Sequence, residues 1–314
     1  MFELLNGWQR GFPLVPRPFA AIGARLGMSE DEVIAACRCG LEAGEISRIG
    51  VVFAPRAAGA STLAALRAPP GELPRIAEIV SAQPEVNHNY ERGHALNLWF
   101  VATAPDQGAL DAALARIGSL TGCEVLPLPM VEEFHIDLGF DLRTGVSPRG
   151  PARTPGATLD ADDRRLVKAV QGGLELVARP FDALAARAGT TEIDVLARLG
   201  RWLESGVARR MGIVVRHDSQ GYRANAMAVW DVPDATATQA GERLARHDEV
   251  TLCYRRERRL PRWPYNLFCM VHGRDRAAVE ASLARIAHED GLDAFPAAVL
   301  FSGRCFKQRG ARYA

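Results

Sequence analysis

The chain has 314 residues, of which 48% are hydrophobic, so it is long enough for two sizeable domains with a core each. Its formal net charge of +1 at pH 7 lacks the overall basic excess that is typical of nucleic-acid-binding proteins. No apolar run reaches about 18 residues, and residues 1–8 lack the basic and apolar regions of a signal peptide, so the sequence predicts a cytoplasmic protein without a membrane partner.

The chain contains an internal duplication. Residues 14–52 recur without a gap as residues 176–214, and residues 86–92 (VNHNYER) match residues 250–256 (VTLCYRR). The repeated unit is longer than the roughly 20–50 residues of a solenoid repeat, so the pattern predicts two copies of one domain pair. Positions at which the copies differ then indicate where specialised chemistry lies.

Each copy opens with a helical module, in residues 1–53 and 163–215. In the first copy a helix over residues 19–26 precedes Ser29, which forms a capping-box pattern with Glu32 and starts a second helix that ends at Gly44. A β wing follows over residues 46–53, and the second copy repeats the pattern. The module resembles the winged helix-turn-helix of the Lrp/AsnC transcription regulators.

The resemblance makes DNA binding one alternative function, but the charges argue against it. A recognition helix needs cations or amides where it enters the groove, because phosphate neutralisation supplies most of the affinity. The first recognition helix begins with Glu30, Asp31 and Glu32 and has only Arg38 as a cation further along, while in the second copy Glu192 and Asp194 face Arg198 and Arg201. Since the first turns are acidic, we expect the module to serve packing or dimerisation and not to bind nucleic acid.

A βαββαβ pattern follows each wing, in residues 54–141 and 216–314. The expected strands are 62–68, 86–92, 97–103 and 124–129 in the first copy, and 250–256, 264–271 and 292–300 in the second. The expected helices are 72–82, 107–120, 235–247 and 276–288. The pattern predicts an α+β, ferredoxin-like sandwich with helices on one sheet face, whose other face is covered by the second copy. Residues 142–162, rich in Pro, Gly and Thr, form the linker.

The hairpin strands carry the candidate chemistry. By strand alternation His88, Tyr90 and Arg92 share one face. The second copy keeps the tyrosine and the arginine as Tyr254 and Arg256 but replaces the histidine by leucine. On the next strand the difference is reversed, because His272 of the second copy corresponds to a threonine of the first. The two copies have divided their histidines between them.

Positive charge is carried almost entirely by arginine. The densest cluster consists of Arg255, Arg256, Arg258, Arg259 and Arg262. Arginine forks bind carboxylates bidentately and stack on flat rings, so this cluster suits a planar polyanion. The six cysteines, in contrast, include no CxxC pair, so we expect free thiols and no metal site made by the protein.

Two motifs in these strands resemble the siroheme (sirohaem) decarboxylases, which are Lrp/AsnC-like proteins. Residues 88–100 (HNYERGHALNLWF) are similar to a motif of the first subunit of these enzymes, and residues 254–273 (YRRERRLPRWPYNLFCMVHG) to a motif of the second. In many organisms the subunits are separate, whereas here they look fused, as in the NirD–NirL type. The resemblance covers nearly the whole chain except the linker.

The resemblance implies a carboxy-lyase that removes carbon dioxide from the acetates of siroheme at positions 12 and 18. The product would be 12,18-didecarboxysiroheme, on the way to heme d1 in denitrification or to heme. Loss of carbon dioxide from a pyrrole acetate leaves an electron pair, for which protonation of the ring provides a sink, and the methyl carbon must then gain a proton. Histidine suits these steps because its pKa lies near neutrality.

Strand positions and resemblance together give hypothetical roles to individual residues. His88, His94 and His272 are the candidate catalytic acids and bases. The candidate substrate-binding residues are Tyr90, Arg92, Tyr254, Arg256, Arg258, Trp263, Tyr265 and Lys307. The cationic side chains would hold carboxylates, and Trp263 and Tyr265 are expected at a partly exposed rim. The iron would belong to the substrate, so we expect no further cofactor; a histidine would alternatively approach the iron axially.

Other classes of function stay open at this point. An Lrp/AsnC-like DNA-binding regulator and a non-catalytic heme-binding sensor or carrier are the alternatives to the decarboxylase. The expected partner is siroheme or a related iron tetrapyrrole. The sequence fixes neither the number of substrate sites nor the oligomeric state, so a homodimer and an association with related decarboxylase subunits are both open.

Overall fold

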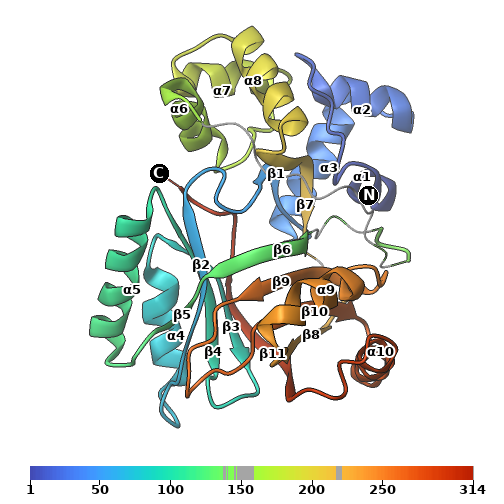
Figure 1. Cartoon of the computed structure of the whole chain (residues 1–314). Coiled ribbons are helices and arrows are strands. Elements are labelled where there is room, and N and C mark those ends of the chain that lie inside the picture. The colour runs from blue at the N-terminus through green and yellow to red at the C-terminus, as the bar shows by residue number, and fades with distance from the viewer. Residues whose placement is uncertain (137–138, 140, 145, 147–158, 217–220, 314) are drawn as a thin grey trace.

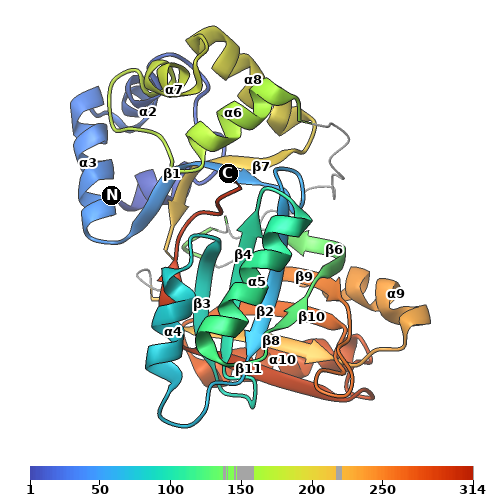
Figure 2. The ribbon, with the colours of Figure 1, turned by 90° about the vertical axis from the view of Figure 1, so that its left-hand side faces the viewer.

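The computed structural model describes residues 1–136, 139, 141–144, 146, 159–216 and 221–313. The two helix-turn-helix modules form one layer, and the two sheet domains lie together below it (Figures 1 and 2). Most of the predicted linker, residues 142–162, lies outside the described residues. No helix in the described part of the chain is long and apolar enough to span a membrane.

The helix-turn-helix layer contains the predicted helices and wings of both copies, each preceded by one further helix that was not predicted. In the first copy these are α1 (Phe2–Gly7), α2 (Pro18–Leu26), α3 (Glu30–Glu42) and the wing β1 (Ile46–Phe53). In the second copy they are α6 (Ala161–Val170), α7 (Pro180–Ala188), α8 (Glu192–Glu204) and the wing β7 (Ala208–Val215). The predicted capping box is present: the Ser29 hydroxyl accepts from the N–H of Glu32, and the Glu32 carboxylate accepts from the N–H of Ser29.

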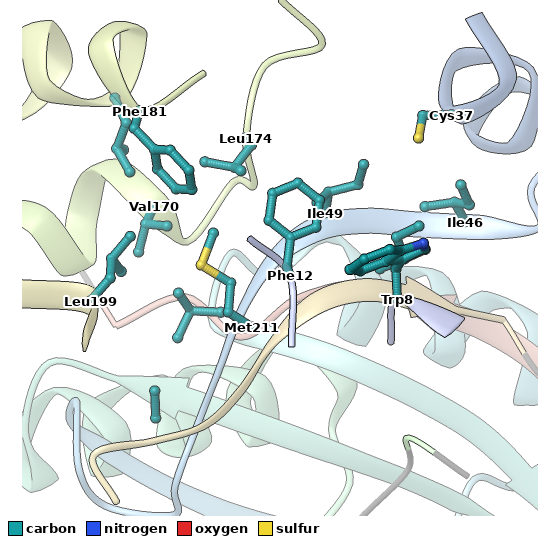
Figure 3. Packing of buried hydrophobic residues seen from close by; sticks show 14 of the residues in the cluster. Trp8, Phe12, Cys37, Ile46, Ile49, Val170, Leu174, Phe181, Leu199 and Met211 are labelled. Carbon is teal, nitrogen blue, oxygen red and sulfur yellow. The ribbon is translucent and has the colours of Figure 1, made fainter. Parts of the chain in front are cut away.

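The two modules pack on each other through their wings. β1 and β7 pair antiparallel, with Gly50 opposite Gly212. Figure 3 shows the buried core that they share, in which Trp8, Phe12 and Ile49 of the first copy lie near Met211 of the second. A Cβ atom at Gly212 would lie 2.3 Å from the carbonyl oxygen of Gln9, so glycine is required for this close approach. The expectation of a packing role for the module therefore agrees with the structure.

The sheet domains confirm the α+β, ferredoxin-like fold class. The first copy contains β2 (Ala60–Leu66), α4 (Leu73–Ala82), β3 (Val86–Arg92), β4 (Leu98–Ala104), α5 (Gln107–Thr121), β5 (Leu126–Leu128) and β6 (Met130–Ile136). The second contains β8 (Ala224–Trp230), α9 (Asp234–Leu244), β9 (Val250–Arg256), β10 (Leu267–Gly273), α10 (Arg276–Glu289) and β11 (Ala297–Gln308).

The last strand of each copy crosses to the other copy, which the sequence analysis did not predict. The strands form one sheet in the order β5-β2-β4-β3-β11-β8-β10-β9-β6. β6 pairs with β9 of the second copy, and β11 pairs with β8 over residues 297–301 and then with β3 of the first copy over residues 302–308. The predicted ends at residues 129 and 300 were therefore wrong, because each chain segment continues as a strand in its partner copy.

The two copies face each other across a shared apolar layer. Helices α4 and α5 cover the outer face of the first copy and α9 and α10 that of the second (Figure 1). Between the inner faces lies a buried cluster that includes Trp99 and Leu128 of the first copy and Met227, Phe268 and Leu300 of the second. The predicted face-to-face pairing within one chain is thus present, and Trp99 and Phe268 are core residues as expected.

Candidate active site between the two copies

A cavity of about 780 Å³ lies between the two copies and reaches the turn at Ala43 and Gly44 of the helix-turn-helix layer. Its volume falls within the range of about 300–1,000 Å³ that is usual for sites of small molecules and cofactors. The candidates that line it are His88, Tyr90, Arg92, Tyr254 and His272. Apolar walls are formed by Leu63, Trp99, Val101, Met227, Leu252 and Met270. The structure therefore brings the two histidines that differ between the copies to one cavity.

His88 enters the cavity from β3, where it lies opposite Gln308 of β11. Its ring stacks with that of Tyr90, with 6.2 Å between centroids and 20° between planes. Burial and the positive charge of Arg48 lower the pKa of His88 to about 4. At neutral pH the imidazole is therefore uncharged, and a polyanionic ligand beside it would raise the pKa again.

Arg92 is the buried cation of the cavity wall, with 7% of its surface exposed. Its Nη1 donates to the carbonyl oxygen of Leu300 at 2.9 Å, across the boundary between the copies. Burial lowers the pKa of Arg92 to about 10, so the guanidinium stays charged at neutral pH. Its Nε has no hydrogen-bond partner among the described residues. A buried cation with a spare donor favours an anionic ligand, since leaving it unpaired is costly.

Tyr254 forms part of an aromatic stack in the same wall. Its ring lies 5.6 Å from the ring of Phe268, and the guanidinium of Arg256 lies 4.4 Å from its centroid. This stack holds the tyrosine at the cavity surface while only 6% of the residue is exposed. Arg256 itself does not line the cavity, because its Nη1 donates to the carbonyl oxygen of Leu128 at 2.5 Å.

His272 enters the cavity from β10, opposite Asn225 of β8. Its Nδ1 lies 2.8 Å from the hydroxyl of Thr251 on β9. The Oδ1 atom of Asn225 is buried without a hydrogen-bond partner among the described residues. This part of the cavity thus offers an imidazole, an unpaired amide oxygen and, from the loop before β8, the exposed Arg223.

The sequence analysis missed several polar lining residues. Arg216 and Arg223 lie on either side of the residues left undescribed before β8, and Asn225 lies at the start of that strand. No motif marks them. Comparison of the copies provides a signal, because alignment places Arg216 on Ala54 and Arg223 on Gly59. The second copy therefore adds Arg216 and Arg223 to the cavity at positions where the first copy has small residues, while the first copy provides Arg92.

Three aromatic candidates lie away from the cavity. His94 is half-buried in the β3–β4 loop, where its Nδ1 accepts from the N–H of Leu96 at 3.0 Å and burial lowers its pKa. Its ring contacts that of Trp263, with 5.4 Å between centroids. Trp263 is fully buried, so the expectation of an exposed rim was wrong for it, and Tyr265 packs against it in an edge contact. These residues support the core beside the cavity instead of lining it.

Two cationic candidates are engaged elsewhere. Arg258 forms ion pairs of 2.7 Å with both Asp231 and Asp234. The ammonium of Lys307 donates to the carbonyl oxygens of Ser81 and Gln83, and burial lowers its pKa to about 8. Neither residue lines the cavity, so the structure does not support direct contact of either with a ligand there.

Comparison with known proteins identifies the family. The model of the AsnC-like ligand binding domain matches residues 58–135 and 219–307, and the siroheme decarboxylase NirDL-like HTH domain matches residues 3–46 and 163–209. The chain is 46% identical over 316 residues to the siroheme decarboxylase NirDL subunit of Paracoccus denitrificans (strain Pd 1222), covering 99% of this chain and 96% of the relative.

Two crystal structures agree with this match. The structure of the siroheme decarboxylase NirDL superposes with a TM-score of 0.70 at 29% identity, covering 99% of this chain and 94% of that chain. The structure of NirDL in co-complex with an iron-uroporphyrin III analogue superposes with a TM-score of 0.68 at 29% identity, covering 97% and 91%. Fold and cavity define a duplicated Lrp/AsnC-type protein. The chain belongs to the siroheme decarboxylase NirDL family, which confirms the resemblance carried by residues 88–100 and 254–273.

Proposed function

We propose that this chain is a siroheme decarboxylase that removes carbon dioxide from the acetates at positions 12 and 18 and releases 12,18-didecarboxysiroheme. The observation that carries the proposal is the meeting of His88 and His272, from different copies, in the walls of one cavity. Support comes from the 46% identical NirDL relative and from the NirDL structure with an iron-uroporphyrin III analogue.

The cavity walls suit a carboxylated macrocycle. The apolar walls at Trp99, Leu252 and Met270 offer flat surfaces to a ring, whereas Arg92 and Arg223 offer guanidinium donors to carboxylates at its edge. The iron enters with the substrate, so the reaction requires no further cofactor from the protein.

Each decarboxylation consumes one proton. The carbon–carboxylate bond breaks and carbon dioxide leaves. The electron pair of the broken bond passes into the protonated pyrrole system. The former methylene carbon then takes up a proton and becomes a methyl group, while the ring releases the proton that it had gained, so that one proton is consumed in total. We assign proton transfer to His88 and His272, because these two imidazoles line the cavity. We assign no role at the cavity to His94, since its Nδ1 is held by the loop and its ring packs on Trp263.

The burial of His88 adds a condition to this assignment. With a pKa of about 4, the ligand-free imidazole cannot serve as an acid at neutral pH. The carboxylates of siroheme, once bound, would offset the charge of Arg48 and raise the pKa of His88 towards neutrality. Substrate binding would thereby favour protonation of His88, which then holds the proton that the reaction uses.

The assay separates this function from the two alternatives. We expect anaerobic incubation of siroheme with the protein to give products that have lost one and then two carbon dioxide units by mass spectrometry. A heme carrier would bind siroheme and return it unchanged. A DNA-binding regulator would do neither and would bind duplex DNA in a salt-sensitive way.

Alanine replacements test the histidines. We expect His88→Ala and His272→Ala each to lower the rate of decarboxylation about 10²- to 10⁴-fold, the usual contribution of a positioned acid or base. His288→Ala is the matched control, because the side chain of His288 is 84% exposed on α10, outside the cavity. Full activity of both cavity variants would refute the assignment.

A further inference from the structure

We propose that Thr251 is a positioning residue that holds the neutral ring of His272 in the Nδ1–H tautomer; the catalytic consequence of this rests on the function proposed above. Thr251 is buried, with 1% of its surface exposed, and it does not line the cavity. Its hydroxyl lies 2.8 Å from Nδ1 of His272 and 3.0 Å from the carbonyl oxygen of Met270.

The number of donors and acceptors that each group carries decides the direction of these two hydrogen bonds. A carbonyl oxygen can only accept, so the single proton of the Thr251 hydroxyl goes to Met270. The hydroxyl oxygen then accepts from His272, whose Nδ1 must carry a hydrogen. Nε2 of the neutral ring consequently holds the lone pair. Nε2 is the nitrogen that would take up a proton and pass it on, while Nδ1–H keeps the same hydrogen bond in both charge states.

A β-bulge places Thr251 where it can do this. In the pairing of β9 with β10, Met270 lies opposite Leu252 and Val271 opposite Val250, so Thr251 is the additional residue. Bulges change the direction of a side chain and are frequent beside active sites. The extra residue is thereby free to reach His272 on the adjacent strand instead of following the alternation of β9.

The first copy has the same bulge with a different pair of side chains. In the pairing of β3 with β4, Val86 lies opposite Ala102 and His88 opposite Val101, so Asn87 is the additional residue. The hydroxyl of Thr103 lies 3.0 Å from Oδ1 of Asn87 and 2.7 Å from the carbonyl oxygen of Arg312. The duplicated bulge therefore holds a side chain of the next strand in both copies, and only in the second copy is that side chain an imidazole.

The first copy supplies a matched control. Thr251→Val removes the acceptor at His272 with little change in shape, and Thr251→Ser keeps the hydroxyl. Thr103→Val makes the same change in the first copy, at a residue that is equally buried, at 2% exposure, and lies outside the cavity. If the removal of any buried, hydrogen-bonded hydroxyl lowered the rate of decarboxylation, both valine variants would show the loss.

The tautomer is measured in the ligand-free protein, independently of activity. Long-range ¹⁵N–¹H correlation spectra of histidine-labelled protein, with His272 assigned from the spectrum of His272→Gln, report which ring nitrogen carries the hydrogen. We expect the Nδ1–H form in the wild type, in Thr251→Ser and in Thr103→Val, and a loss of that form in Thr251→Val. Retention of the Nδ1–H form in Thr251→Val overturns the proposal even if siroheme is decarboxylated normally.

Kinetics test the consequence for catalysis. We expect Thr251→Val to lower kcat roughly 10- to 100-fold with little change in KM, as is usual when the support of a catalytic imidazole is removed, and Thr251→Ser to restore the rate. An equal loss in Thr103→Val would show a merely structural role and overturn the proposal. If the wild type does not decarboxylate siroheme, the proposed function fails, whereas the spectra still decide whether Thr251 sets the tautomer.

Discussion

The two histidines of the cavity differ in what surrounds them. His88 is kept neutral mainly by burial, to which the positive charge of Arg48 adds. His272 contacts a hydroxyl that accepts a hydrogen bond. The two imidazoles of one cavity thus lie in different surroundings, one set by burial and a nearby charge and the other by a hydrogen bond, as is common where acid and base roles are divided.

Proton uptake on ligand binding tests the environment of His88. Because the pKa of His88 is about 4 in the free protein, a polyanionic porphyrin that raises it should bind with uptake of up to one proton between pH 5 and about 6.5. Its affinity should therefore rise as the pH falls through this range. Calorimetry with iron-uroporphyrin III in buffers of different ionisation enthalpy measures the uptake.

The control for this measurement is the variant His88→Gln, which cannot take up the proton, beside His288→Gln on the exposed face of α10. The difference in proton uptake between wild type and His88→Gln isolates the contribution of His88 from protonation of the ligand itself. Equal uptake by the two proteins would contradict the predicted shift in pKa.

At the residue scale the sequence predicted the histidines better than the cations. Comparison of the copies identified His88 and His272 because each stands where the other copy has a different residue type. Arg258 was expected to hold a carboxylate of the ligand and Trp263 to lie at an exposed rim, whereas aspartates of the protein bind Arg258 and aromatic rings bury Trp263. Trp99 of β4 packs on Trp263, and the aspartates that bind Arg258 lie just before α9 and at its first residue. These neighbours lie in other elements of the chain, so the local sequence does not indicate them.

At the element scale the periodic segments were predicted well. The helix that begins after Ser29 and the strand Val86–Arg92 have the expected positions, because a capping box and the alternation of His88, Tyr90 and Arg92 are local signals. Only the second half of β11 was not predicted, since residues 302–308 pair with β3 more than 200 residues earlier. A pairing of that kind is set by the meeting of the two copies, which no local pattern records.

The close approach of the wing β7 to the N-terminal segment gives a prediction about stability. Gly212→Ala would place a methyl group 2.3 Å from the carbonyl oxygen of Gln9 and 2.4 Å from that of Trp8. Backbone atoms cannot give way cheaply, so we expect a loss of about 1–3 kcal/mol or more in the free energy of unfolding, measured by denaturant titration.

Gly200→Ala in α8 is the matched control, because a Cβ atom there has no neighbour within 4 Å. Alanine in a helix interior should instead stabilise by about 0.5–1 kcal/mol. A destabilisation of similar size in both variants would show that the tight packing at Gly212 is not the cause.

At the scale of the whole molecule, the helix-turn-helix layer has lost the charges that a DNA reader needs. Arg17 is paired with Glu30 and Arg179 with Glu192, at equivalent places in the two copies. Arg198 is surrounded by aspartates of α6 and α8. These three cations are thus neutralised by the protein itself, and the layer is held together by a core common to both copies.

Splitting the chain tests how strongly the copies depend on each other. We expect residues 1–150 and 151–314, produced together as two polypeptides, to elute as a one-to-one complex that decarboxylates siroheme. The paired wings, the exchanged strands β6 and β11 and the shared core would hold them without the linker. Each half produced alone should aggregate, because its inner sheet face would be exposed. Soluble, monomeric halves would contradict this interdependence.

The course of β11 has a consequence for biosynthesis. Residues 302–308, which complete the sheet of the first copy beside β3, are synthesised more than 200 residues after that strand. This protein therefore cannot follow the usual order, in which an N-terminal domain folds completely while the rest of the chain is still being translated. A nascent chain must keep the edge of β3 uncovered until residues 302–308 have been made, and a premature stop before residue 302 would disable the half that was made first.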